Sequence, residues 1–137
     1  MRILLDTNVI VDNLARRDEY GESLQILVLC ENGFLEGHVT TATIMDVMYI
    51  LRKYLSPDEI RDSVQMILLI VNVVPVLKSD IHAALRGGWT DLEDAVQAAC
   101  AMRLNVDYIV TRNTKDFVDS SVPAITPHNL LKILNQS

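Results

Sequence analysis

Close to its N-terminus the chain has three consecutive large apolar residues, Ile3, Leu4 and Leu5, followed at once by the polar triplet Asp6-Thr7-Asn8. Successive side chains of a strand point to opposite faces of a sheet, so an unbroken apolar run predicts a strand that is covered on both faces. Such strands lie at the centre of parallel sheets. Asp6 then stands at the carboxyl edge of the sheet, where open α/β folds bind their ligands.

The rest of the chain alternates short strand patterns with helical ones. Ser56-Pro57-Asp58-Glu59 is the clearest helix start, because it combines a Ser cap, a Pro at the first helical position and a capping-box Glu. Pro123 marks the last strand as an edge strand, since proline lacks a backbone donor. This alternation predicts one α/β domain over residues 1–137, with helices on both faces of a parallel sheet. We expect strands near residues 3–5, 38–40, 73–76, 106–111 and 122–126, and helices near residues 9–14, 22–31, 44–54, 57–71, 79–86, 92–103 and 129–135.

The cysteines and the apolar runs of the chain indicate which classes of protein it can belong to. The two cysteines, Cys30 and Cys100, are far apart and have no paired spacing, which supports neither a disulfide framework nor a cysteine metal site. We expect them to be buried thiols in a reducing compartment. The longest apolar run, residues 66–77, is interrupted by Asn72 and Pro75 and is too short to cross a bilayer. The expected location is therefore the cytoplasm, without a membrane partner.

The formal net charge of −6 argues at first against a nucleic-acid partner. Charges more than about 8 Å apart are largely screened at physiological salt, however, so local charge matters more than the total. If several acids share one site, a bound divalent cation reverses the sign there and attracts phosphate.

Three acids, Asp91, Glu93 and Asp94, stand at the start of the helix expected over residues 92–103. The helix dipole stabilises acids in that position, which is the simplest explanation for them. Asp91, Asp94 and Ala98 share one helix face, so Asp94 is expected to point back to the sheet edge. Glu93 is expected to face solvent or the preceding loop.

A second polar cluster, residues 111–117, follows the strand expected over residues 106–111 and repeats the layout seen at Asp6. Taken alone, it reads as a turn in which Asn113 adopts a backbone conformation that few residues tolerate, Asp116 caps the turn and Phe117 anchors it in the core. A further acid, Asp46, falls within the helix expected over residues 44–54. The coincidence of these acids at one sheet edge favours a shared site.

The acids lie in four sequence segments: Asp6-Thr7-Asn8, Thr43-Ile44-Met45-Asp46-Val47-Met48-Tyr49, Asp91-Leu92-Glu93-Asp94-Ala95-Val96-Gln97-Ala98-Ala99 and Asp107-Tyr108-Ile109-Val110-Thr111-Arg112-Asn113-Thr114-Lys115-Asp116-Phe117. Together they resemble the PIN domain, most closely bacterial toxins of the VapC type, over nearly the whole chain. The resemblance implies a three-layer α/β/α sandwich with a central parallel sheet. It also implies a metal-dependent endoribonuclease that leaves a 5′-phosphate and a 3′-hydroxyl, a small antitoxin as partner and a homodimer.

By the same resemblance, the catalytic, metal-binding acids are Asp6, Asp46, Asp94 and Asp116. Asp46 stands where the family usually has Glu, so a bridging water is the alternative to direct coordination by this shorter side chain. Asn113 stands where the family often has Asp. Either Asp116 supplies the fourth acid, or the site keeps three acids and an amide.

The expected chemistry follows from the ligands. Carboxylates forced together repel by about 4 kcal/mol per pair at 4 Å for an effective dielectric of ~20, so they favour a bound cation. Oxygen ligands select Mg²⁺ or Mn²⁺, which would orient a water and neutralise charge on a phosphodiester. Arg112 and Lys115 are candidates for RNA-backbone contacts, with solvated loop charges as the alternative. The residues expected to hold the carboxylates or bound waters are Thr7, Asn8, Thr111 and Asn113.

Three other functions compete with this interpretation. A phosphoacceptor receiver domain needs an acid pair after its first strand, where this chain has Asp6 followed by Thr7. A haloacid-dehalogenase-type phosphatase needs a second Asp two residues after the first, and Asn8 stands there. The stronger competitor keeps the PIN fold but has a catalytically weakened site and serves as an RNA-binding or protein-interaction module.

Overall fold

The computed structural model describes residues 1–17 and 20–135. Its strands form a five-stranded sheet in the order β3-β2-β1-β4-β5. All neighbouring strands are parallel. As predicted, the first strand is central: β1 (Arg2–Leu5) lies between β2 (Glu36–Thr40) and β4 (Tyr108–Val110). β5 (Ala124–Ile125) follows Pro123 at one edge, also as predicted, and β3 (Asn72–Val74) forms the other edge.

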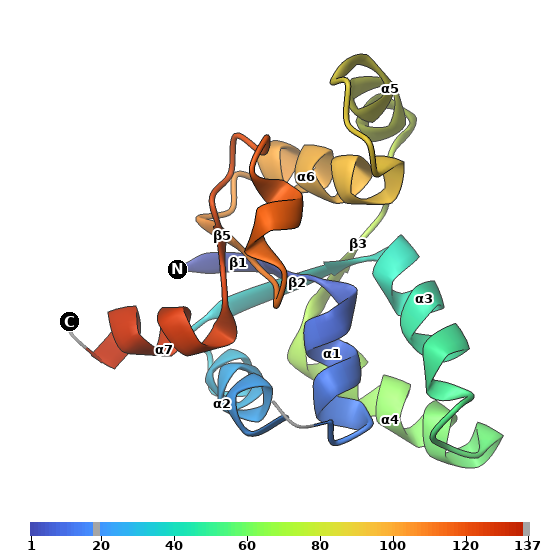
Figure 1. The fold of residues 1–137 in the computed structure, drawn as a ribbon. Helices are drawn as coiled ribbons and strands as arrows, with labels where there is room; N and C mark the ends of the chain where they lie inside the picture. The colour runs from blue at the N-terminus through green and yellow to red at the C-terminus, as the bar shows by residue number, and fades with distance from the viewer. Residues whose placement is uncertain (18–19, 136–137) are drawn as a thin grey trace.

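The side chains of β1 divide the interior into two cores. Ile3 and Leu5 are fully buried in the larger core, whereas Leu4, between them, is fully buried in the smaller one. Helices cover both faces of the sheet, which confirms the predicted three-layer α/β/α sandwich (Figure 1). The larger core is covered by α1 (Thr7–Leu14), α2 (Tyr20–Glu31), α3 (Thr41–Leu51), α4 (Pro57–Ile70) and α7 (Pro127–Asn135).

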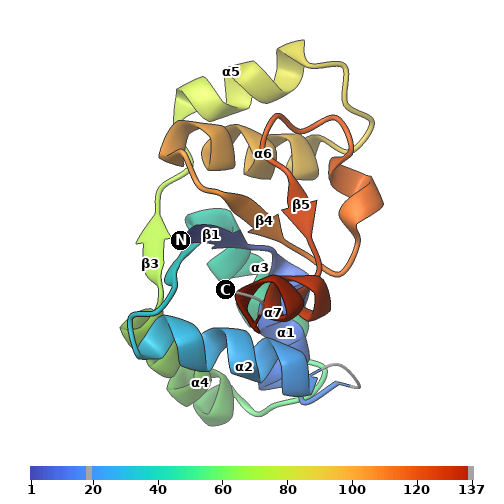
Figure 2. The same cartoon turned by 90° about the vertical axis from the view of Figure 1, so that its left-hand side faces the viewer.

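The opposite face carries α6 (Leu92–Leu104) and the short 3-10 helix η1 (Thr114–Phe117). Small side chains, Ala98 and Ala101, let α6 approach Leu4 closely. α5 (Lys78–Arg86) packs on the outer side of α6, away from the sheet (Figure 2). The second face is therefore two helices deep where α5 lies over α6.

Caps explain where the helices begin. The predicted capping box at the start of α4 is present, with Ser56 and Glu59 bonded to each other's backbone N–H groups. Five helices begin one to three residues earlier than predicted, and in two of them, α1 and α3, a polar residue at a strand end supplies the cap. Asp6 accepts the Thr7 N–H to start α1, and Thr40 accepts the Thr43 N–H to start α3.

Two sequence expectations outside the site also hold. Cys30 and Cys100 are buried free thiols, as predicted from their spacing. In the part of the chain that the structure describes, no helix combines the length and apolar character needed to cross a bilayer.

Candidate active site

Asp6 stands at the carboxyl end of β1, where hydrogen bonds from Thr7, Thr111 and Asn8 hold its carboxylate. Its Oδ1 accepts the Thr7 N–H at 2.9 Å. Its Oδ2 accepts the Thr111 hydroxyl at 2.8 Å and the Asn8 amide at 3.1 Å. Burial raises the pKa of Asp6, the bonds from Thr111, Thr7 and Gln97 lower it, and the net shift is upward. The fold thus keeps this carboxylate in place while opposing its charge.

Asp94 approaches the same edge from the first turn of α6. It is half-buried, and its N–H is capped by the Asp91 carboxylate at 3.1 Å. Burial, followed by the negative charges of Asp91, Asp6 and Asp116, raises the pKa of Asp94 to about 7. Three acids that are far apart in the sequence, Asp6, Asp94 and Asp116, therefore act on one another electrostatically, as expected for acids gathered at one sheet edge.

Asp116 lies on η1, which follows β4. The buried Phe117 fixes η1 to the smaller core and makes an edge-on contact with Trp89, with ring centroids 6.3 Å apart. Asn113 precedes η1 and donates its N–H to the Thr111 hydroxyl at 3.1 Å. Asn113 has φ −115° and ψ 71°, which lies outside the helical, extended and left-handed regions, in line with the expected unusual backbone.

A cavity of about 580 Å³ opens beside Asp6 and Asp94. Asp46 from α3 and Glu93 from α6 line it as well, and none of the described lining residues is Lys, Arg or His. Glu93 is exposed, as predicted, and its contribution to the cavity was not anticipated. The rest of the wall is largely apolar, with Met45, Val76, Ile81, Leu92 and Val96.

A comparison with protein families gives a match between residues 2–115 and the PIN domain. The chain belongs to the PIN domain family. A comparison with proteins of curated function gave no match.

Solved structures agree with this assignment. A toxin–antitoxin complex from Klebsiella pneumoniae is 27% identical to this PIN domain, with a TM-score of 0.68 over 91% of this chain and 97% of that chain. FitAcB from Neisseria gonorrhoeae is 20% identical, with a TM-score of 0.72 over 92% and 98%. VapBC2 from Rickettsia felis, bound to a promoter DNA fragment, is 18% identical, with a TM-score of 0.69 over 92% and 98%. The fold of this PIN domain is thus shared with all three structures.

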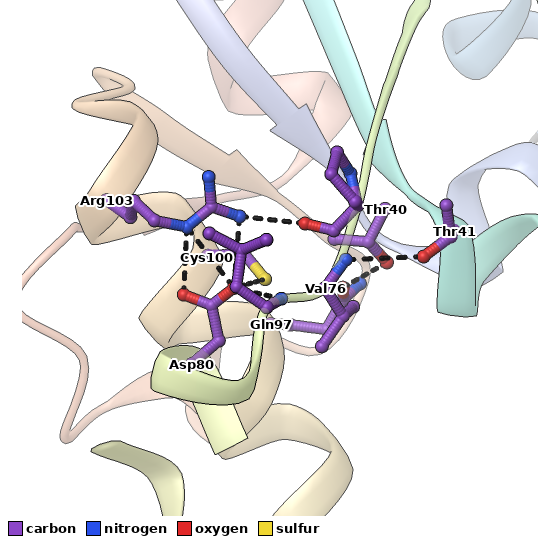
Figure 3. A network of polar contacts seen from close by, with 9 residues as sticks. Thr40, Thr41, Val76, Asp80, Gln97, Cys100 and Arg103 are labelled. Carbon is purple, nitrogen blue, oxygen red and sulfur yellow. Dashed lines mark hydrogen bonds and ion pairs between the residues drawn. The ribbon is translucent and has the colours of Figure 1, made fainter. Parts of the chain in front are cut away.

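Sequence reasoning missed Gln97, which lies one turn after Asp94 on α6. Its side chain is buried and lines the cavity. Its Oε1 accepts the Thr40 hydroxyl (Figure 3), and its Nε2 donates to the Thr43 hydroxyl, both at 2.8 Å. The available signal was its position three residues after Asp94, which places the two side chains on one helix face.

Arg112 and Lys115, the candidates for RNA contact in this PIN domain, differ in their surroundings. The guanidinium of Arg112 pairs with the buried Asp12 at 3.1 Å, and Asp12 also pairs with Arg17 at 2.7 Å. Arg112 further donates its backbone N–H to the Asn8 side chain at 3.2 Å, whereas Lys115 is exposed on η1. Asp12 was not predicted; the only sequence signal was an acid within an otherwise apolar helix segment.

Within residues 1–17 and 20–135, no three His, Cys, Asp or Glu side chains stand close enough together to form a ready-made metal site. The chemistry of the donors nevertheless fits a hard divalent cation. The cavity offers carboxylate and hydroxyl oxygens. Burial and then the neighbouring acids raise the pKa of Asp94, and none of the described lining residues is a basic side chain that would offset the charge of these acids.

Proposed function

We propose that this PIN domain is a metal-dependent endoribonuclease that uses Mg²⁺ or Mn²⁺ and acts as the toxin of a toxin–antitoxin pair. The observation that carries the proposal is that Asp6 at the end of β1, Asp46 on α3 and Asp94 on α6 line one cavity. Uncompensated carboxylates at a cavity are an unfavourable arrangement for stability alone, and a cation relieves it.

In the proposed site, Asp6, Asp94, Asp116 and Asp46 would hold the cation. Asp6 is already oriented by Thr7, Asn8 and Thr111. Asp94 has to release its proton to become a ligand, so the affinity for metal falls as the pH falls below about 7. The bound cation supplies a water of lowered pKa and a positive charge opposite the phosphate. Asp46 is exposed on α3, which is consistent with contact through a water.

The proposed substrate is RNA. Hydrolysis adds water across the P–O3′ bond, so that the phosphate stays on the 5′ side of the downstream fragment and the 3′ oxygen gains a proton. The apolar part of the cavity offers a surface for a base or ribose beside the acids. Lys115 is free to approach the phosphate backbone, whereas Arg112 would have to do so while paired with Asp12. Asn113 would help to hold Thr111 and hence Asp6.

The proposed protein partners are a small antitoxin and a second copy of the chain. One solved relative is described as a toxin–antitoxin complex, which supports the first partner. Apolar side chains on α2 and α4 are available for either contact: Leu24, Val28 and Met66 are exposed, and Leu69 is 89% exposed. A cytoplasmic location goes with this proposal.

A second candidate function is a PIN-fold module that binds RNA or protein without catalysis. The exposed Asp46 and the absence of a ready-made acid cluster in the described residues favour it. Binding of Mn²⁺ and of RNA without any turnover would select this alternative.

The test is cleavage of end-labelled structured RNA in Mg²⁺ or Mn²⁺ by the wild type and by Asp6→Asn. Asn still caps α1, so the fold should be retained by circular dichroism. We expect the rate of RNA cleavage to fall at least ~100-fold. This is the upper end of the loss that follows when a residue supporting a metal ligand is replaced. The control Asp58→Asn, an exposed acid on α4, should retain the wild-type rate. Full activity of Asp6→Asn, or of the wild type in chelator, would refute the mechanism.

A further inference from the structure

The side-chain amide of Gln97 joins three elements at the candidate site. Gln97 belongs to α6, and its two 2.8 Å bonds reach Thr40 at the end of β2 and Thr43 in the first turn of α3. All three residues are buried. A buried amide is held firmly because each unmade hydrogen bond would cost about 1–3 kcal/mol.

The direction of the amide follows from its partners. The Thr40 hydroxyl donates to Oε1, so Nε2 is turned to the opposite side. An amide nitrogen has two N–H donors, and one of them goes to Thr43. Gln97 and Asp6 line the same cavity. The Thr7 hydroxyl, next to Asp6, also donates to Thr43, at 3.3 Å.

We propose that Gln97 is a positioning residue of the proposed metal site: its amide, oriented by Thr40, holds the Thr43 hydroxyl. Thr43 in turn accepts from Thr7, whose N–H holds the Asp6 carboxylate for contact with the cation. The inference rests on the proposed function and extends it to a residue outside the acidic set. Gln97 and Asp94 share one face of α6. The hydrogen bonds of Gln97 therefore also influence the distance between Asp94 and Asp6.

The test measures binding of Mn²⁺ to the RNA-free protein by calorimetry, with electron paramagnetic resonance as the report on coordination. Gln97→Met removes both amide groups at similar volume, and we expect its Kd for Mn²⁺ to rise about 10-fold or more, with an altered spectrum. Cys100→Ala is the matched control. It removes a buried bond to Asp80 from the same helix and should leave the Kd within about 2-fold.

A double-mutant cycle separates positioning from simple destabilisation. Thr40 does not line the cavity in the described structure, so Thr40→Val should weaken Mn²⁺ binding only through Gln97 or through the lost cap of α3. We expect Thr40→Val to raise the Kd in the wild type and to have no further effect in Gln97→Met. An undiminished effect in the double variant would place the role of Thr40 in α3 and would contradict the proposed orientation of the amide.

The remaining outcomes each decide a different point. A wild-type Kd and spectrum in Gln97→Met would overturn the inference and leave the proposed function standing. Failure of the wild type to bind Mn²⁺ more tightly than Asp6→Asn would overturn the proposed function and the inference with it. If Gln97→Met does not fold, Gln97→Asn, whose amide is one methylene too short to reach both threonines, is judged by the same criteria.

Discussion

The folded protein favours the protonated form of Asp94, whereas the proposed function requires the ionised form. Burial and the charges of Asp91, Asp6 and Asp116 raise its pKa from 3.8 to about 7. Between these values the folded protein holds a proton that the unfolded chain releases, so the free energy of unfolding falls as the pH rises. The stabilisation is complete below about pH 4 and is lost as the pH passes 7.

Replacing Asp94 should therefore stabilise the metal-free protein at alkaline pH. We expect Asp94→Asn to exceed the wild type by about 1 kcal/mol at pH 8, or roughly 3–4 °C in Tm, because it removes a half-buried charge. The difference should vanish near pH 4, where Asp94 is protonated. Thermal unfolding in chelator at both pH values measures it, and a wild type as stable as the variant at pH 8 would contradict the electrostatic assignment.

At the level of elements, one ion pair secures α5 on α6. Asp80, at the start of α5, is buried and accepts from the Leu77 N–H at 2.8 Å and from Arg103 of α6 at 3.0 Å. Arg103 also donates to the Pro75 carbonyl at 2.8 Å, just before α5 (Figure 3). Since Ile81 of α5 lines the cavity, this anchor also supports the wall of the candidate site.

Loss of this anchor should destabilise the fold. We expect Arg103→Met to lower the free energy of unfolding by about 2–3 kcal/mol, somewhat below the range for a fully buried pair because the Arg103 side chain is 30% exposed. Urea unfolding at pH 7 measures the change. Arg61→Met is the control: its pair with Asp58 is exposed, and its loss should cost less than about 0.5 kcal/mol.

The Asp80–Arg103 ion pair also predicts how the free energy of unfolding changes with pH. Burial raises the pKa of Asp80, but the bonds from Arg103, Leu77 and Cys100 outweigh burial, and the net shift is downward. When folding lowers the pKa of an acid, the acid stabilises the fold at pH values above its pKa in the unfolded chain, here near 3.8. This stabilisation is lost as the pH falls through the pKa of the folded state. The destabilisation in Arg103→Met should accordingly be largest near neutral pH and shrink in acid; a constant difference would contradict it.

For the whole molecule, the net charge of −6 opposes the approach of the proposed RNA substrate, and the proposed cation would offset that charge at the site. A polyanionic RNA approaches an acidic protein only where the local charge is reversed. A ligand that binds only the folded state stabilises it, by about 1.4 kcal/mol at ten times its Kd. Mg²⁺ at that concentration should thus raise the Tm of the wild type by roughly 4 °C.

The matched protein for this measurement is Asp6→Asn, whose Tm should stay nearly constant over the same range of Mg²⁺. Differential scanning calorimetry at pH 8, where Asp94 is ionised, gives both curves. An equal shift in the two proteins would mean that Mg²⁺ binds elsewhere on the acidic surface, and the proposed site would lose its support.

Local sequence determined most of the fold. The apolar run ending at Leu5 marked a central strand, Ser56 and Glu59 marked a helix start, and Pro123 marked an edge strand, because periodicity, caps and a missing donor are properties of neighbouring residues. Acids at strand ends were foreseeable for the same reason. Two of the helices that begin earlier than predicted, at Thr7 and Thr41, do so because polar groups at strand ends cap them.

Tertiary structure alone decided how the acids are held. Thr111 reaches Asp6 across 105 positions, Gln97 reaches Thr40 across 57, and Arg112 pairs with a buried Asp12. No local spacing encodes these contacts, because they exist only once parallel pairing of β1 with β2 and β4 brings the strand ends to one edge and burial removes competing water. The sequence thus determined which residues stand at that edge, and packing decided which of them bind one another.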